Sequence, residues 1–273
     1  MPFTLVSFHA HPDDEALLTG GTLARVAAEG HRVVLVTATA GGAGLSSDGT
    51  GADRSLADHR RAELAVAATA LGCARWEVLG YEDSGWGEPT GKTAHRATPS
   101  FSDLDPSGPA ERLADLLREE HADALTIYDV AGGYGHPDHV QVHRVGVLAA
   151  ELAGTPVVLE ATVDRGRLRR VASVMRWLPG ISRLVPAGGF ATSYVARAEL
   201  THEVDVRAHL AAKRAALSAH ASQATGGTSI RTLTLLLRLP GPVLGLALGR
   251  EWFRERGRSP GGPLLDDVFA SLR

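Results

Sequence analysis

The sequence has a single cysteine, no asparagine and only two lysines among its 273 residues. One cysteine excludes an intramolecular disulfide and any zinc or iron–sulfur site built from several thiolates. Without asparagine there is no N-glycosylation acceptor. Twelve histidines and 31 acidic residues remain, so any bound metal must be held by nitrogen and oxygen ligands.

The chain also lacks a long uninterrupted hydrophobic run. Its most apolar segment, residues 233–248, is broken by Arg238, Pro240 and Pro242, so we expect no membrane span. A net charge of −3, a pI near 6.5 and the absence of a basic run argue against a nucleic-acid partner. No positively charged segment precedes the short apolar run at the N-terminus, which argues against a signal peptide. We therefore expect a soluble, cytoplasmic protein.

Short apolar runs alternate with helical patterns through the first 160 residues. The expected strands cover residues 5–8, 33–36, 76–79, 124–128 and 157–159. The expected helices cover residues 15–29, 53–71, 110–120 and 138–152. This order predicts an α/β protein with a Rossmann-like, doubly wound, mostly parallel sheet. Residues 85–109 predict a long loop, a kind of segment that often binds ligands.

The alternation weakens after residue 160. Helices are expected at residues 165–177 and 206–220, in a segment otherwise interrupted by glycine and proline. We interpret residues 1–160 as a catalytic domain and residues 161–273 as a smaller C-terminal sub-domain that completes the substrate site. Trp252 and Phe253 are expected to pack in the interior, with a lid or an oligomer contact as the alternatives, so a homo-oligomer stays open.

Two similar corners combine histidine, proline and acidic residues. They read His9-Ala10-His11-Pro12-Asp13-Asp14-Glu15 and Tyr134-Gly135-His136-Pro137-Asp138-His139. One such corner alone has an ordinary explanation, because proline is favoured at the first helical position and acids in the first turn. Together they predict more, because both follow expected parallel strands and ligands bind at the carboxyl ends of such strands. Two histidines and one carboxylate with an open fourth position form a catalytic zinc site, and the remaining groups can transfer protons.

The same corners carry a family resemblance. The motifs His-Pro-Asp-Asp-Glu and His-Pro-Asp-His resemble the PIG-L/LmbE-like N-deacetylase family. The resemblance covers residues 3–145, including residues 60–64, 80–85 and 132–135, and returns at residues 213–223. It implies zinc-dependent hydrolysis of a linear amide in an N-acetylated amino sugar, a GlcNAc-type glycoside, with release of acetate and free amine.

The resemblance also implies which residues bind the metal: His11, Asp14 and His139, with Asp13 as the general base. Zinc can lower the pKa of a bound water from about 15.7 to about 7, which is roughly 12 kcal/mol less for proton removal. Two neighbouring side chains on a helix diverge by about 100°, so Asp14 can bind the metal while Asp13 takes the proton. Ferrous iron, cobalt or another divalent ion suits the same ligands.

Five further residues receive roles from the family pattern. His136 would stabilise the oxyanion or protonate the leaving amine, and Asp138 would orient it. Tyr134 would swing toward the carbonyl oxygen. Arg60 and Asp83 would contact the sugar or its attached group.

Several alternatives stay open at this point. His143 follows His139 at i, i+4 spacing and could be a ligand, although the flanking glutamate of a zincin is missing. Residues 41–44 form a glycine-rich stretch without the GxGxxG pattern, so a loop lining the site is preferred to a dinucleotide loop. The enzyme could instead cleave a larger N-acyl group, as in mycothiol-conjugate or antibiotic-tailoring amidases. A catalytically inactive sugar-binding protein is the alternative from another class.

Overall fold

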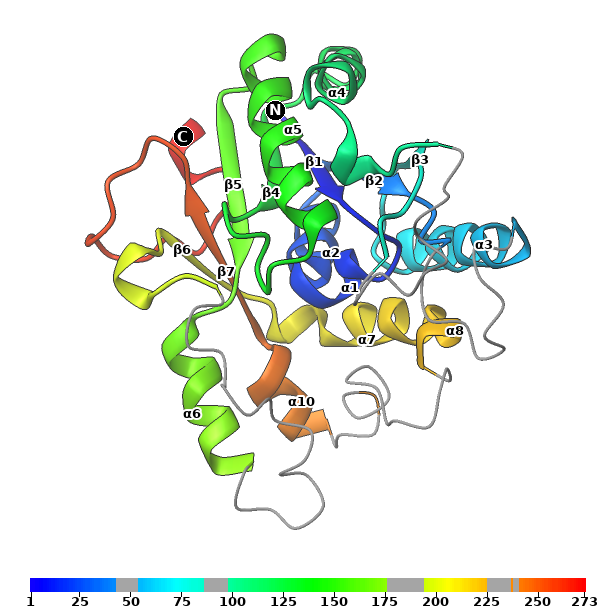
Figure 1. Ribbon diagram of the computed structural model, residues 1–273. Helices are drawn as coiled ribbons and strands as arrows, with labels where there is room; N and C mark the ends of the chain where they lie inside the picture. Colours follow the sequence, from blue (N-terminus) through cyan, green and yellow to red (C-terminus); the bar gives the residue numbers. More distant parts are fainter. Residues whose placement is uncertain (43–53, 86–97, 176–193, 225–236, 238–240) are drawn as a thin grey trace.

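The computed structural model describes residues 1–42, 54–85, 98–175, 194–224, 237 and 241–273 (Figure 1). Its centre is a seven-stranded sheet with the strand order β3-β2-β1-β4-β5-β7-β6. The parallel strands are β1 (Thr4–His9), β2 (Arg32–Thr39), β3 (Arg75–Tyr81), β4 (Ala124–Tyr128) and β5 (Val157–Thr162). The two antiparallel strands are β6 (His202–Asp205) and β7 (Arg250–Glu255). The predicted α/β class with a mostly parallel sheet is confirmed.

Helices cover both faces of the sheet, as the predicted doubly wound fold requires (Figure 1). One core lies between the sheet and α2 (Gly20–Ala28), α3 (Arg54–Ala70) and α7 (Leu210–Ala219). The other lies between the sheet and α4 (Ser107–Glu119) and α5 (Pro137–Ala153). Leu5 of β1 belongs to the first core and Val6 to the second. Because both faces are covered, all six β1 residues are buried, which explains why apolar residues of β1 lie on both faces.

The helix predicted over residues 15–29 is wrong in one respect, because the structure divides it at Thr19. α1 (Asp14–Leu18) precedes the division and α2 follows it. A Cβ on Gly21 would lie 2.5 Å from a valine of the C-terminal segment, so only glycine allows α2 to pack this closely. The Glu251 carboxylate accepts hydrogen bonds from two N–H groups at the start of α2, which satisfies donors that a helix terminus leaves unpaired.

The segment after residue 160 extends the same sheet through β7 and β6 (Figure 1). Its helices are α6 (Arg165–Met175), α7, α8 (Ala221–Ala224) and α10 (Gly241–Leu248). The sequence predicts α6 and α7 but not the two strands, which are short and rich in charged residues. Trp252 and Phe253 of β7 are buried, so packing rather than an exposed contact accounts for this pair. The domain boundary at residue 160 stays a prediction.

The loop predicted over residues 85–109 is only partly within the described chain, since residues 86–97 lie outside it. The described remainder forms a short 3-10 helix, Phe101–Asp103, and the beginning of α4. Further 3-10 helices span Arg197–Glu199, Arg207–His209 and Ala270–Leu272. None of the helices within the described ranges combines the length and the apolarity that crossing a membrane requires.

β1 and β4 are hydrogen-bonded neighbours in the middle of the sheet, where Leu5 pairs with Ala124 and Ser7 with Thr126. The strand order reverses between them, because β2 and β3 lie beyond β1 while β5 lies beyond β4. Ligand sites of open parallel sheets lie at such a switch point, beyond the carboxyl ends of the strands. The two corners follow these two ends, so the sheet itself brings them together.

Candidate active site and metal centre

The first corner connects β1 to α1 and contains an unusual backbone conformation. Asp13 has φ 109°, in the left-handed region, at a cost of about 1–3 kcal/mol for a residue with a side chain. Asp13 therefore precedes the helix. The predicted reason for the different roles of Asp13 and Asp14, a divergence of about 100° between neighbouring side chains of one helix, is wrong. The carboxylates nonetheless have different partners: Asp14 lies against two histidines, whereas Asp13 Oδ1 lies 3.5 Å from Arg60 Nη2.

The second corner begins α5, with His136 as the N-cap and Pro137 as the first helical residue. The Asp138 N–H donates to His136 Nδ1 at 3.1 Å, so we infer that the neutral imidazole carries its proton on Nε2. Burial, together with the nearby histidines, lowers the pKa of His136 to about 4. The ring is therefore neutral at pH 7. The bond that joins Asp138 to His136 comes from the backbone, and an orienting role for the Asp138 carboxylate stays a prediction.

Three side chains from the two corners form a group with the spacing of a metal site. Asp14 Oδ2 lies 3.3 Å from His11 Nδ1 and 3.3 Å from His139 Nε2. One ligand atom from each residue lies within 4.8 Å of the others. Both ring nitrogens of His139 are buried without a hydrogen-bond partner in the described part of the chain. Such atoms are costly, and a cation beside Nε2 would remove part of that cost. Two histidines and a carboxylate suit a divalent metal.

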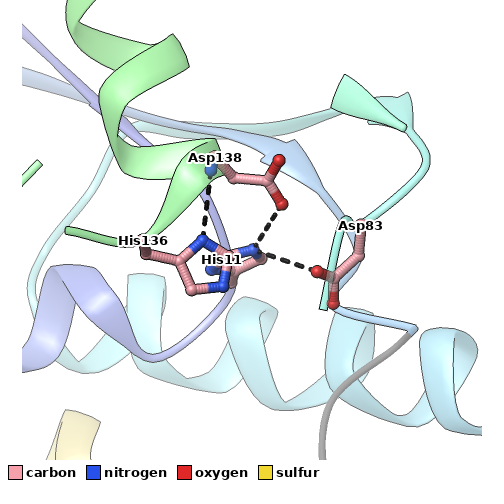
Figure 2. Close-up of side chains that lie close together, drawn as sticks. All are labelled: His11, Asp83, His136 and Asp138. Atoms are coloured by element: carbon pink, nitrogen blue, oxygen red, sulfur yellow. Dashed lines mark hydrogen bonds and ion pairs between the residues drawn. The ribbon is translucent and has the colours of Figure 1, made fainter. Parts of the chain in front are cut away.

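A second His/Asp group shares His11 with the first and consists of His11, Asp83, His136 and Asp138 (Figure 2). The Asp138 carboxylate accepts hydrogen bonds from the N–H groups of Ser84 and Ser102, at 2.9 and 3.1 Å. Asp138 Oδ2 also lies 3.1 Å from His11 Nε2, and Asp83 Oδ1 lies 3.3 Å from the same nitrogen. These carboxylates contact the ring nitrogen of His11 that does not face Asp14. Carboxylates commonly orient metal-binding histidines in this way, so the first group is the better metal site.

Negative charge exceeds positive charge around His11. Burial by itself lowers the pKa of His11, but the three surrounding aspartates outweigh it and raise that pKa well above its ordinary value. Burial by itself raises the pKa of Asp14, but His139 and His11 outweigh it and lower that pKa. The group therefore favours positive charge. A proton on His11 or a bound divalent cation can supply that charge.

The remaining predicted residues lie around these groups. Arg60 is buried and donates to the carbonyl oxygens of Pro12 at 2.5 Å and Gly41 at 2.7 Å. Its Nε is buried without a partner among the described residues. The Gly41 contact places the start of the glycine loop at the site, while residues 43 and 44 lie outside the described chain. Tyr134 is 44% exposed, and its ring centroid lies 5.0 Å from that of His139.

Each of the nine predicted site residues thus contacts at least one other: His11, Asp13, Asp14, Arg60, Asp83, Tyr134, His136, Asp138 and His139. Their assigned roles stay predictions. Among the described residues, His143 belongs to neither metal-ligating group, because its Nδ1 lies 3.0 Å from the carbonyl oxygen of Tyr128. His9 is buried, and its Nδ1 lies 3.1 Å from the Tyr128 hydroxyl.

Sequence reasoning gave no role to three polar residues that organise the site. Asp129 accepts hydrogen bonds from the N–H groups of Ala131 and Gly133, in the loop that leads to His136. An aspartate at the start of a glycine-rich turn was the available signal, since its side chain commonly bonds to the backbone two residues on. Glu15 and His220 are both completely buried and form an ion pair. Their separation by 205 positions left no local signal of the pairing.

Comparison with known proteins decides the family. Residues 6–150, which include both corners, match the family model PIG-L, described as GlcNAc-PI de-N-acetylase. The chain belongs to the PIG-L family. The predicted resemblance is therefore confirmed over the segment that contains all nine predicted site residues.

Relatives and solved structures extend the similarity beyond residue 150. A 1D-myo-inositol 2-acetamido-2-deoxy-α-D-glucopyranoside deacetylase from Nocardioides sp. is 34% identical and is matched over 98% of both chains. A relative with the same name from Thermobispora bispora is 38% identical over 97% of both chains. The structure of N,N′-diacetylchitobiose deacetylase from Pyrococcus horikoshii matches with a TM-score of 0.58 and 23% identity, covering 99% of this chain and 88% of that one. This last likeness shows the shared fold.

Proposed function

We propose that this PIG-L protein hydrolyses the acetamide of 1D-myo-inositol 2-acetamido-2-deoxy-α-D-glucopyranoside and releases acetate and the free amine. The observation that carries the proposal is the group of His11, Asp14 and His139, with the Asp13 carboxylate beside it. Two relatives matched over almost their whole length carry this activity in their names. The reaction belongs to the class that the sequence predicts, deacetylation of an N-acetylated amino sugar. The chain has suitable residues at the positions proposed for the metal ligands, the base and the hydrogen-bond donor, which disfavours an inactive sugar-binding protein.

The metal we propose is zinc, held by His11, Asp14 and His139, although iron(II) and other divalent ions suit the same ligands. Such an ion polarises the amide carbonyl and makes a water molecule more acidic, lowering its pKa from about 15.7 toward about 7. Asp83 and Asp138 contact His11 Nε2 and so fix the ring with Nδ1 toward Asp14.

Proton transfer and charge stabilisation fall to the chain's own residues. Asp13 accepts the proton of the attacking water, while the Arg60 guanidinium 3.5 Å away orients its carboxylate. His136 donates its Nε2–H to the carbonyl oxygen as that oxygen becomes negative. Because the His136 ring is neutral, protonated Asp13 returns its proton to the departing amine nitrogen. Tyr134, whose partly exposed ring packs against His139, is a second donor for the same oxygen.

A free-amine-release assay on three substrates tests the proposal, because hydrolysis of each of the three amides releases an amine. Zinc-loaded protein should act on the GlcNAc-inositol substrate with a kcat/KM about 100-fold above that for an amino sugar with a larger N-acyl group. Free N-acetylglucosamine serves as the third substrate, and chelator-treated protein as the control. Turnover of the larger amide alone would establish an amidase instead. Binding of all three sugars without turnover would establish a sugar-binding protein.

The fall of kcat/KM at acidic pH should reflect protonation of the Asp13 carboxylate. Burial raises the pKa of Asp13 to about 6, although Arg60 opposes the shift. Only the ionised carboxylate accepts a proton, so kcat/KM should fall roughly tenfold per pH unit below that pKa and level off above it. The positive charge of a bound cation moves the midpoint to lower pH, which places it at or below about pH 6. A midpoint above pH 7, or a rate that rises on acidification, would contradict the assignment.

A further inference from the structure

A buried ion pair joins the first corner to the C-terminal segment. His220 Nε2 lies 2.6 Å from Glu15 Oε1, and neither side chain is exposed. Glu15 follows the two aspartates of the corner and lies in α1, whereas His220 ends α7. Ser222, two residues further on, contacts the Glu63 carboxylate of α3 through both its N–H and its hydroxyl, at 2.8 and 2.7 Å. The turn that carries His220 is therefore fixed to the catalytic half of the chain.

The second oxygen of Glu15 contacts the backbone of Asp13. Glu15 Oε2 accepts a hydrogen bond from the Asp13 N–H at 2.9 Å. Because His220 binds Oε1, the carboxylate plane is fixed with Oε2 toward this N–H. Asp13 is the residue with φ 109°. The hydrogen bond from its N–H to Glu15 therefore helps to hold a backbone conformation that is unfavourable by itself.

The peptide group between Pro12 and Asp13 is bound at both of its ends. Arg60 Nη2 donates to its carbonyl oxygen at 2.5 Å, and Glu15 Oε2 accepts from its N–H at 2.9 Å. These two contacts fix the orientation of the peptide plane, and with it the direction in which the Asp13 side chain leaves the backbone. His220 is one step removed, since it acts on Asp13 through Glu15.

We propose that Glu15 and His220 are positioning residues for the catalytic base, a role that rests on the proposed function of Asp13. The C-terminal segment then contributes to turnover through His220 without contacting the substrate. The competing explanation is a purely structural ion pair that ties α7 to the rest of the protein. Both explanations predict lost stability when the pair is broken. They differ in what happens to Asp13.

The chain offers a matched control for the structural explanation. Lys213 lies seven residues before His220 on the same helix, and its Nζ lies 2.5 Å from Glu251 Oε1. Both partners of this pair are also buried. Within the described residues, Glu251 forms its further hydrogen bonds with the N-terminus of α2 rather than with either corner. Lys213→Met therefore breaks a buried ion pair of α7 that does not contact Asp13.

The test compares His220→Leu, His220→Gln and Lys213→Met by zinc content, thermal unfolding and acetate release. His220→Leu should lower kcat about tenfold or more, with KM within about twofold and zinc content unchanged. His220→Gln retains an N–H donor for Glu15 and should recover most of kcat. Lys213→Met should lower the unfolding temperature while kcat stays within about twofold. Equal losses of kcat in the two apolar variants, or no loss in His220→Leu, would overturn the proposal.

Two additional measurements separate this inference from the proposed function. In an Asp13→Asn background, His220→Leu should leave the residual rate unchanged, because its effect passes through Asp13. A full additional loss there would show a role independent of the base. A crystal structure of His220→Leu or of Glu15→Gln needs no turnover: Asp13 should leave its left-handed conformation or adopt several conformations. An unchanged Asp13 would overturn the positioning role even for an active enzyme, whereas inactive wild-type protein would instead overturn the proposed function.

Discussion

Replacement of Asp13 by asparagine should lower kcat about 10²–10⁴-fold, the usual contribution of a general base. Asparagine has nearly the same shape but cannot accept the proton of the attacking water. Asp13 is not part of the group formed by His11, Asp14 and His139, so the variant should bind zinc as the wild type does. Steady-state acetate release together with metal analysis of the same samples measures both effects.

A control for loss of one negative charge is Asp115→Asn. Asp115 is an exposed carboxylate of α4 that pairs with Arg118, remote from both corners in the chain. Its removal should leave kcat within about twofold, since exposed ion pairs contribute little. Wild-type turnover in Asp13→Asn would contradict the assignment of the base. Loss of zinc from Asp13→Asn would show that Asp13 is a ligand instead.

His139→Ala should abolish stoichiometric zinc binding and lower turnover about 10³-fold or more, because the cation supplies several kcal/mol of transition-state stabilisation. In the proposed site His139 would supply one of three protein ligands, and its buried ring nitrogens form no hydrogen bond among the described residues. Metal analysis after dialysis, followed by the acetate assay with and without added zinc, measures both losses.

The matched control is His143→Ala, one turn further along α5. His143 Nδ1 lies 3.0 Å from the carbonyl oxygen of Tyr128 and is outside both metal-ligating groups of the described chain. This variant should retain one zinc per chain and most of its kcat, with any cost appearing in the unfolding temperature. Loss of zinc from His143→Ala, with retention by His139→Ala, would reverse the two assignments.

The two corners could be predicted because their signals are local and the sheet makes them neighbours. His-Pro-Asp patterns mark two helix starts, and parallel strands place those starts at one edge of the sheet. The continuous apolar runs likewise identified buried strands, because helices cover both faces. The prediction of one site from the two motifs is therefore a consequence of alternating strands and helices.

Other features depend on contacts that no local pattern contains. Directly after the division at Thr19, the N-terminus of α2 is capped by Glu251, which lies far away in the sequence. β6 and β7 pair antiparallel at one edge of the sheet, although their sequences are short and charged. The left-handed conformation of Asp13 is stabilised by the hydrogen bond to Glu15, whose own partner is His220. Tertiary contacts decide such details, so the sequence could predict the residues of the site but not the backbone conformation of Asp13.

Anomalous diffraction at the zinc absorption edge from crystals of the zinc-loaded protein tests the central claim most directly. Two overlapping His/Asp groups share His11, and the position of the ion distinguishes them. The metal centre described above predicts one strong peak bound by His11, Asp14 and His139, with Asp13 close by but not coordinated. A peak bound instead by Asp83, His136 and Asp138, or no peak at either corner, would contradict it.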